Sequence, residues 1–162
     1  MEKMNLIIGN NDILKEECKE FDFANPPFDP LEFSKNLVQI MYDNNGIGLA
    51  ANQVGIPYKI FTMRGKPADF ACFNPKIVMP SEEKITLEET CLSFPGLAVK
   101  IKRSQHVRVR FQIPSGETVT QMFTGMTARV FQHELDHLNG IIFYKRANRF
   151  HREKAFKKCG II

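Results

Sequence analysis

The chain has 162 residues, of which 43% are hydrophobic and 25% charged, and it carries a formal net charge of +4 at pH 7. These values are ordinary for a globular protein, and the length fits one core, so we expect residues 1–162 to form a single domain. No apolar run approaches the roughly 20 residues of a membrane span, and residues 1–14 do not resemble a signal peptide. We therefore expect a cytoplasmic protein without membrane contact.

The first predicted elements are helices. Residues 11–20 carry few apolar side chains and could form a short helix. Asp29 is a good N-cap with Pro30 at the first helical position, and an apolar stripe at helical spacing continues to about Tyr42. Residues 44–46, Asn-Asn-Gly, are a natural stop because Asn and Gly tolerate left-handed backbone.

The next segment, residues 46–53, reads Gly-Ile-Gly-Leu-Ala-Ala-Asn-Gln. Two glycines and two alanines keep it thin, so another backbone or a ligand can approach it closely. Its simplest interpretation is a tight connection between a helix and a strand. Gln53 suggests more, because a neutral amide beside a thin loop can donate a hydrogen bond to a substrate oxygen.

From residue 58 onward the pattern changes to short β-like runs separated by Gly and Pro. In the clearest run, apolar and polar residues alternate from Val107 to Ile113, as in a half-buried strand. A helix, several antiparallel strands and a final helix predict an α+β fold. The predicted strands are residues 58–63, 71–73, 77–79, 97–102, 107–113 and 118–123, with a hairpin turn at 114–117.

The final helix, predicted over residues 126–138, carries Gln-His-Glu-Leu-Asp-His at residues 132–137. Four helical residues turn about 400°, so His133 and His137 share one face and can bind the same metal ion. Glu134 lies beside them, within reach of a metal-bound water. This pattern is typical of a hydrolytic metal site.

A third ligand must come from elsewhere in the chain. A free cysteine is more often a small buried hydrophobe than a ligand, but beside this helix Cys91 is the best available thiolate. Two imidazoles and one thiolate leave the fourth tetrahedral position open for water, as in catalytic zinc sites. The four cysteines are widely spaced, so we expect free thiols rather than a disulfide framework.

Three segments together resemble the peptide deformylase family: residues 46–53, residues 89–93 (Glu-Thr-Cys-Leu-Ser) and residues 132–137. Their order and separation match that family as well. The resemblance implies antiparallel sheets packed around the central motif helix. It also implies an enzyme that removes the formyl group from the N-terminal formylmethionine of nascent polypeptides and releases formate.

The resemblance assigns roles to individual residues. It implies Glu134 as the acid–base catalyst, and Gln53 and the backbone N–H of Leu92 as the groups that hold the formyl oxygen. It implies three metal ligands, Cys91, His133 and His137. This ligand set suits zinc by chemical preference, whereas the family works best with Fe²⁺. We therefore expect Fe²⁺ in the cell, with Zn²⁺, Ni²⁺ or Co²⁺ as alternatives in the isolated protein.

In the family, residues near the three motifs line a pocket for the methionine side chain. Thr90 departs from the family pattern there, and the charge of Arg129 is unexpected in such a pocket. Arg129 does not suit a thioether unless its stem packs and its head reaches water. Thr90 replaces a glycine, which is costly if its φ is positive. The residues expected to bind substrate in this pocket are Ile47, Gly48, Leu87, Met126, Arg129 and Val130.

Three charged residues complete the expected surroundings of the site. Glu89 and Arg103 match an ion pair that supports the cysteine loop in the family, although two unrelated surface charges are the simpler alternative. Asp136 could orient a ligand histidine, but we favour an exposed position on the helix.

Basic residues crowd the last eighteen positions against a single acid, Glu153. Family members often continue into a long helix, which is cut here to residues 147–162 or less, as in short forms from phages. A solvated face is the favoured interpretation of this charge, and a weak ribosome contact through the basic tail is the alternative. The chain has no aromatic-interleaved nucleic-acid motif, and we expect no DNA binding.

A zinc endopeptidase is the main alternative function, because such enzymes also use His-Glu-x-x-His. Gly140 stands where one protease pattern requires glycine, but the last ligand position of that pattern is Phe143, which cannot bind metal. In proteases that use a downstream glutamate as third ligand, the ligand would have to be Glu153. The tail has little room for the helix that should carry that glutamate. A non-enzymatic metal- or RNA-binding module is a further alternative, against which an intact Glu134 and Gln53 argue.

Overall fold

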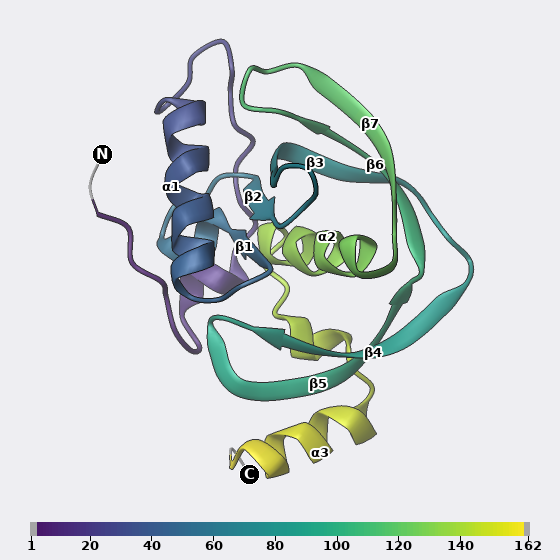
Figure 1. Ribbon diagram of the computed structural model, residues 1–162. Helices are drawn as coiled ribbons and strands as arrows, with labels where there is room; N and C mark the ends of the chain where they lie inside the picture. The colour runs from purple at the N-terminus through teal and green to yellow at the C-terminus, as the bar shows by residue number, and fades with distance from the viewer. Residues whose placement is uncertain (1–2, 161–162) are drawn as a thin grey trace.

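The computed structural model of the protein describes residues 3–160. Helix α2 (Gly125–Leu138) lies between a five-stranded and a two-stranded sheet, and helix α1 (Pro30–Asp43) flanks the larger one (Figure 1). Helix α3 (Arg149–Cys159) packs against strand β5 (Phe94–Ser104) of the smaller sheet. The strands within both sheets pair antiparallel. The predicted α+β architecture, with antiparallel sheets around a central helix, is therefore confirmed.

The strands follow the sequence pattern closely in the larger sheet, whose order is β1-β2-β3-β6-β7. The strand bounds are β1 (Gly48–Ala50), β2 (Ile60–Met63), β3 (Phe70–Pro80), β4 (Lys84–Cys91), β6 (His106–Gln112) and β7 (Thr118–Thr124). In β6, Val107, Val109 and Phe111 are buried and the residues between them are exposed. That period of two lets the sheet cover α2 with one face while the other meets water.

Helix α1 begins and ends at the predicted signals. The Asp29 side chain accepts hydrogen bonds from two backbone N–H groups of the first turn, at 2.9 and 3.2 Å. At the other end Asn45 has a φ of 57°, a conformation that asparagine tolerates better than most residues. The helix expected within residues 11–20 is only one 3₁₀ turn, η1 (Asp12–Lys15).

Strand β3 corrects one prediction. The sequence predicts separate strands at 71–73 and 77–79, divided by Pro75, but they form one continuous strand. The register against β6 shifts across this position, and Asn74 has a φ of 51°. A bulge accommodates proline because the missing N–H falls where the hydrogen-bond ladder is already interrupted.

Strand β4 is the longest strand that sequence analysis missed. Leu87, Glu89 and Cys91 share one face of the strand, and Glu89 is only 6% exposed. A charged residue at an inward position interrupts the apolar alternation by which strands are identified. Cys91 pairs with Phe94 where β4 turns into β5, so residues 88–96 are two strand ends joined by a tight turn.

Apolar clusters fix the positions of α2 and of the C-terminal segment. Phe131 of α2 packs against Phe61 and Phe123 of the larger sheet, with ring centroids 5.1 and 5.8 Å apart. A second cluster joins β5 to the 3₁₀ turn η3 (Phe143–Arg146) and to α3. Helix α3 spans 11 residues, so the C-terminal helix falls within the expected residues 147–162 and does carry Glu153. Residues 161–162 lie outside the described part.

None of the helices within residues 3–160 combines the length and the apolar character needed to cross a membrane.

Candidate active site

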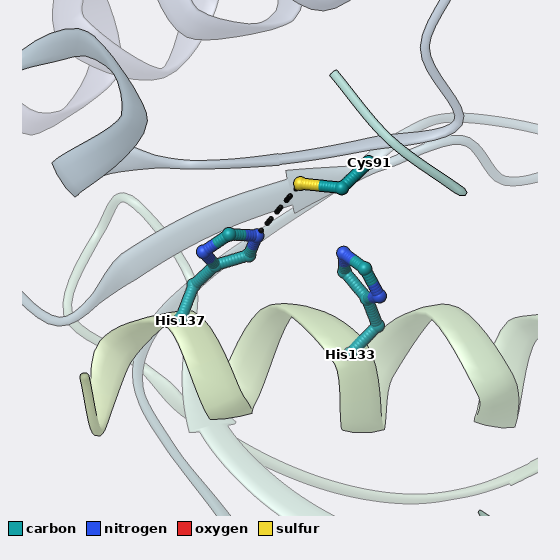
Figure 2. Close-up of side chains that lie close together, drawn as sticks. All are labelled: Cys91, His133 and His137. Atoms are coloured by element: carbon teal, nitrogen blue, oxygen red, sulfur yellow. Dashed lines mark hydrogen bonds between the residues drawn. The ribbon is translucent and has the colours of Figure 1, made fainter. Parts of the chain in front are cut away.

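The three predicted metal ligands converge at one point. His133 and His137 rise from one face of α2 towards Cys91 at the end of β4 (Figure 2). Their candidate ligand atoms all lie within 4.8 Å of one another, and Cys91 Sγ is 3.3 Å from His137 Nε2. All three side chains are buried. Helix α2 supplies two of them because residues four apart in a helix share a face.

The donor set fits a divalent transition-metal ion. A tetrahedral ion with bonds of about 2.0–2.3 Å separates its ligand atoms by about 3.3–3.8 Å, and the 3.3 Å between Cys91 Sγ and His137 Nε2 falls in that range. Thiolate and imidazole ligands suit Zn²⁺ and Fe²⁺. Three protein ligands leave a coordination position for water or substrate, which is the arrangement of a catalytic site.

Each histidine is held by a neighbouring side chain. Glu89 Oε1 lies 2.8 Å from His133 Nδ1, which leaves Nε2 for the metal. Metal-binding histidines usually bond through their other ring nitrogen to a carboxylate or carbonyl, which fixes tautomer and orientation. The other histidine is held through its backbone, because Asn52 Nδ2 donates to the His137 carbonyl at 2.7 Å.

A chain of buried ion pairs supports Glu89. Arg103 donates to both Glu89 oxygens at 2.6 and 3.1 Å and to Asp136 Oδ2 at 2.7 Å, which confirms the expected Glu89–Arg103 pair. Asp136 also accepts two hydrogen bonds from Arg146, at 2.9 and 3.1 Å. The prediction that Asp136 is exposed is wrong. Only 6% of it is accessible, because the segment after α2 returns and covers it with Arg146.

These contacts set the charge of the buried groups. Burial raises the pKa of Glu89, but hydrogen bonds from His133 and Arg103 outweigh this effect and lower the pKa to about 2. Burial lowers the pKa of His133, but hydrogen bonds to Cys91 and Glu89 raise it to about 10. Burial holds the pKa of His137 well below its usual value. Both histidines bind a metal ion in their neutral form, so a raised pKa at His133 would make metal binding depend on pH.

Glu134 lies beside the first histidine and is 3% exposed. Burial raises its pKa to about 7, against the lowering effect of His133, and a pKa near the working pH suits a group that accepts and returns a proton. Its Oε1 has no hydrogen-bond partner within residues 3–160. A Cβ at Gly48 would lie 2.7 Å from Glu134 Oε2, so the thin first segment makes room for this carboxylate.

The 3₁₀ turn η2 (Ala51–Val54) directs the Gln53 amide to the same point. Its Oε1 accepts a backbone N–H at 2.9 Å, and its Nε2 lies 3.0 Å from Ser93 Oγ and 3.6 Å from Cys91 Sγ. These contacts fix the amide with its donor towards the ligand cluster. Leu92 follows Cys91 in the tight turn of the hairpin, and it lines the same cavity as Gln53.

A cavity of about 390 Å³ opens beside the ligands. Leu87, expected to bind substrate, does not line it, because four extended residues place it about 13 Å along the strand from Cys91. Thr90 lines the cavity and is not among the residues with positive φ, so the glycine it replaces was not required for conformation. The other expected pocket residues all line the cavity: Ile47, Gly48, Met126, Arg129 and Val130.

Arg129 lines this cavity. The sequence interpretation required its charged head to reach water, and it does not. Its side chain is 4% exposed, and its guanidinium bonds to Glu89 at 2.6 Å. The charge is therefore neutralised inside the protein.

Neither of the two residues that could occupy the third ligand position of an endopeptidase supplies a ligand here. Phe143 packs against His133, with 5.5 Å between ring centroids. Glu153 is exposed on α3 and pairs with Arg149 at 2.8 Å. Phe143 is thus a buried packing residue of the C-terminal segment, and Glu153 is a surface residue of it.

Sequence analysis did not single out Asn52 or Ser93, which hold His137 and Gln53. The only indication in the sequence was their position, since Asn52 precedes Gln53 in residues 46–53 and Ser93 follows Cys91 and Leu92 in residues 89–93.

Fold and site define a class of protein. A His-Glu-x-x-His helix with a cysteine as third ligand, buried beside a cavity and enclosed by antiparallel sheets, is the centre of a metal-dependent hydrolase.

Comparison with known proteins gives the family. Residues 3–153 match the family model described as polypeptide deformylase. A peptide deformylase of Aquifex aeolicus is 38% identical over 159 residues, which cover 94% of this chain and 92% of the relative. The crystal structure of peptide deformylase from Thermotoga maritima has a TM-score of 0.85 at 34% identity, covering 91% of this chain and 99% of that chain. A Synechococcus elongatus peptide deformylase in complex with actinonin has a TM-score of 0.87 at 31% identity, covering 97% of this chain and 86% of that chain.

The chain belongs to the polypeptide deformylase family, metal-dependent hydrolases that remove the formyl group from the N-terminus of nascent polypeptides.

Proposed function

We propose that Cys91, His133 and His137 hold the metal ion of this deformylase and that Glu134 is its acid–base catalyst. The observation that carries this assignment is the convergence of three ligand atoms within 4.8 Å of one another beside a buried glutamate. We also propose that residues 1–162 act as one catalytic domain with a short basic C-terminal segment.

The reaction is hydrolysis of the formyl amide. Water adds to the formyl carbon, the C–N bond breaks, and formate and a free α-amine leave. When bound, a divalent ion supplies a Lewis acid and lowers the pKa of a coordinated water to about 7. Glu134 accepts a proton from the attacking water and returns it to the leaving nitrogen, and its pKa of about 7 allows both transfers near neutral pH.

Negative charge develops on the formyl oxygen during the attack. Gln53 Nε2 and the backbone N–H of Leu92 donate hydrogen bonds to that oxygen. The Gln53 amide is held by the Ala50 N–H and by Ser93, and its Nε2 also lies 3.6 Å from Cys91 Sγ, a long contact that the formyl oxygen would replace. A donor that is already directed at the site needs little reorganisation in the transition state. Removal of one such donor typically lowers kcat by about 10²- to 10³-fold.

The methionine side chain of the substrate enters the 390 Å³ cavity. Val130 forms part of its buried wall, whereas Ile47 and Met126 are 53% and 58% exposed at its margin. Substrate binding covers these two apolar side chains, which favours an unbranched thioether over a charged group. Gly48 and the stem of Arg129 complete the wall.

The activity is tested with a formylmethionyl tripeptide and with an internal peptide that has no formyl group. We expect formate from the first and no new amine from the second. Cleavage of an internal peptide bond without formate release would contradict the assignment and favour the endopeptidase.

We propose Fe²⁺ as the metal ion in the cell, with Zn²⁺, Ni²⁺ or Co²⁺ in protein isolated in air. The mixed thiolate and imidazole set supports an ion of this kind without selecting one. The protein is purified without oxygen, its metal content measured, and its formate release followed before and after exposure to air. We expect bound iron and activity that air destroys; an air-stable zinc form of equal activity contradicts the proposal.

We propose a weak contact of helix α3 with the ribosome. Its outer face exposes Phe150 (68%) together with Lys154, Lys157 and Lys158, a cationic surface that suits an RNA backbone. Such a partner places the enzyme where nascent chains are made, in the cytoplasm of a bacterium, or of the host cell if the protein is phage-encoded.

The ribosome contact is tested by co-sedimentation at low salt. One variant changes Lys154, Lys157 and Lys158 to Gln. A matched control changes three exposed cations of the larger sheet, Lys76, Arg108 and Arg110, to Gln. We expect only the α3 variant to lose co-sedimentation. Equal loss in both means non-specific charge attraction and contradicts a role for α3.

A further inference from the structure

Arg129 lies one helical turn before His133, at the boundary between the substrate cavity and the metal site. Its guanidinium makes three hydrogen bonds. Nη1 donates to Glu89 Oε2 at 2.6 Å and to the Ile101 carbonyl at 2.8 Å, and Nη2 donates to the Ile85 carbonyl at 2.6 Å. These partners belong to β4 and β5, so one side chain ties α2 to both strands of the smaller sheet.

Glu89 is the point at which Arg129 meets the metal site. Its Oε1 receives His133 Nδ1 at 2.8 Å and Arg103 Nη2 at 3.1 Å. Its Oε2 receives Arg103 Nε at 2.6 Å and Arg129 Nη1 at 2.6 Å. Arg103 contacts both oxygens, at 2.6 Å to Oε2 and 3.1 Å to Oε1. Arg129 binds only Oε2, the oxygen opposite the one that contacts the ligand histidine.

The conformation of Arg129 is governed by these partners rather than by solvent. The side chain is 4% exposed, and its Nε has no hydrogen-bond partner within residues 3–160. A buried donor without a partner is unfavourable. The three hydrogen bonds that its two terminal nitrogens donate to Glu89 and to the two carbonyls offset this cost. Because the terminal nitrogens bond to the smaller sheet, the aliphatic stem is the part of Arg129 that can line the cavity.

We propose that Arg129 is a positioning residue that couples the substrate pocket to the metal site. Its stem forms pocket wall, and its head fixes Glu89 and through it the ring of His133. A residue at this position therefore affects metal affinity as well as substrate binding. This inference rests on the proposed ligation by His133 and deepens the proposed function.

The test compares three variants whose metal affinity is measured without substrate. Arg129→Met keeps an unbranched stem and removes every donor. Arg129→Lys keeps the charge with a compact head that cannot bind Glu89 and both carbonyls in the same geometry. Val130→Ala is the matched control, because Val130 is the next residue, is buried and lines the same cavity, but is apolar and cannot hydrogen-bond Glu89.

The readouts are the dissociation constant for Co²⁺, by competition with a chelator, and the visible spectrum of the Co²⁺ form. We expect Arg129→Met to weaken Co²⁺ binding by about 10- to 100-fold, as loss of a group that orients a ligand typically does, and to shift the spectrum. Arg129→Lys should show a smaller change of both. Val130→Ala should raise KM for a formylmethionyl peptide and leave the Co²⁺ affinity and spectrum unchanged.

A folded Arg129→Met protein with wild-type Co²⁺ affinity and spectrum overturns the proposal. So does an equal change in Val130→Ala, because it would indicate a general loosening of the pocket. If Arg129→Met fails to fold, Arg129→Lys decides by the same two readouts. Failure of the proposed function is seen separately, as absence of formate release by the wild-type protein, and it does not alter the Co²⁺ comparison.

Discussion

Glu89 shows how much of the site depends on one buried charge. A buried carboxylate is unfavourable unless it is paired and hydrogen-bonded, and Glu89 receives donors from His133, Arg103 and Arg129. Sequence analysis recognised the pair with Arg103 from the family resemblance. It did not find the contact with His133, because nothing in the spacing of residues 89 and 133 shows that β4 runs beside α2.

The pKa of Glu89 predicts an acid-sensitive fold. Its pKa of about 2 lies below the usual 4.5, so the stability it contributes is complete above about pH 4.5 and is lost as the pH falls towards 2. Glu89→Gln removes that dependence. We expect a lower Tm at pH 7 and a flatter fall of Tm between about pH 5 and 2. Glu153→Gln, at an exposed carboxylate, is the control that should keep the wild-type profile; parallel curves for Glu89→Gln and wild type would contradict the assignment.

Gly48 is the residue whose size limits the acid–base catalyst. A Cβ there would lie 2.7 Å from Glu134 Oε2 and 2.7 Å from Val130 Cγ1, so Gly48→Ala must displace the carboxylate. Because a displacement of about 1 Å can cost roughly 10²-fold in rate, we expect a loss of that order in kcat. Metal content should stay unchanged, since the atoms nearest to the added Cβ belong to Glu134 and Val130 and not to a ligand. Wild-type kcat in this variant would show that Glu134 does not need its present position.

At the scale of elements, helices were predicted better than strands. The caps of α1 and the histidine face of α2 are local signals, written in a few adjacent residues. The inward Glu89 concealed β4, and Pro75 divided β3 in the sequence but not in the sheet. Asp136 was misplaced because its burial depends on Arg146, which returns only after α2 has ended. Local patterns cannot report such distant partners.

The turn η2 and helix α2 are joined by Asn52, which is fully buried and donates to the His137 carbonyl. Asn52→Leu keeps a similar volume and removes this hydrogen bond. We expect weaker metal binding and a lower Tm, because a buried acceptor loses its partner at a cost of about 1–3 kcal/mol. Thr62→Val is a matched control, since it removes a hydrogen bond of 2.8 Å from the buried Thr62 to the Phe70 carbonyl, between strands β2 and β3. That control should lower Tm alone; equal effects on metal binding would contradict the role of Asn52.

In the whole molecule the metal site bridges two structural units. Cys91 comes from the end of the β4–β5 hairpin, and both histidines come from the helix that packs on the larger sheet. An ion bound by both units must stabilise their association, because it binds the folded chain in preference to the unfolded one.

Removal of the metal is therefore expected to lower Tm. An ion present at about 1,000 times its dissociation constant stabilises a fold by about 4 kcal/mol. We expect a chelator to destabilise the wild-type protein clearly and to leave Cys91→Ala, already weak in metal binding, almost unchanged. A Tm of the wild-type protein that does not respond to chelation would mean that the ion does not join the two units.

The central claim, that Glu134 performs the proton transfers while three other side chains hold the metal, is tested most directly by Glu134→Gln. Metal content and formate release from a formylmethionyl peptide are measured on the same oxygen-free preparation of variant and wild type. We predict an equal metal content and a kcat lower by about 10²- to 10⁴-fold, the usual contribution of a positioned acid–base group. Formate release at the wild-type rate would contradict the account, and so would a loss of metal in proportion to the loss of activity.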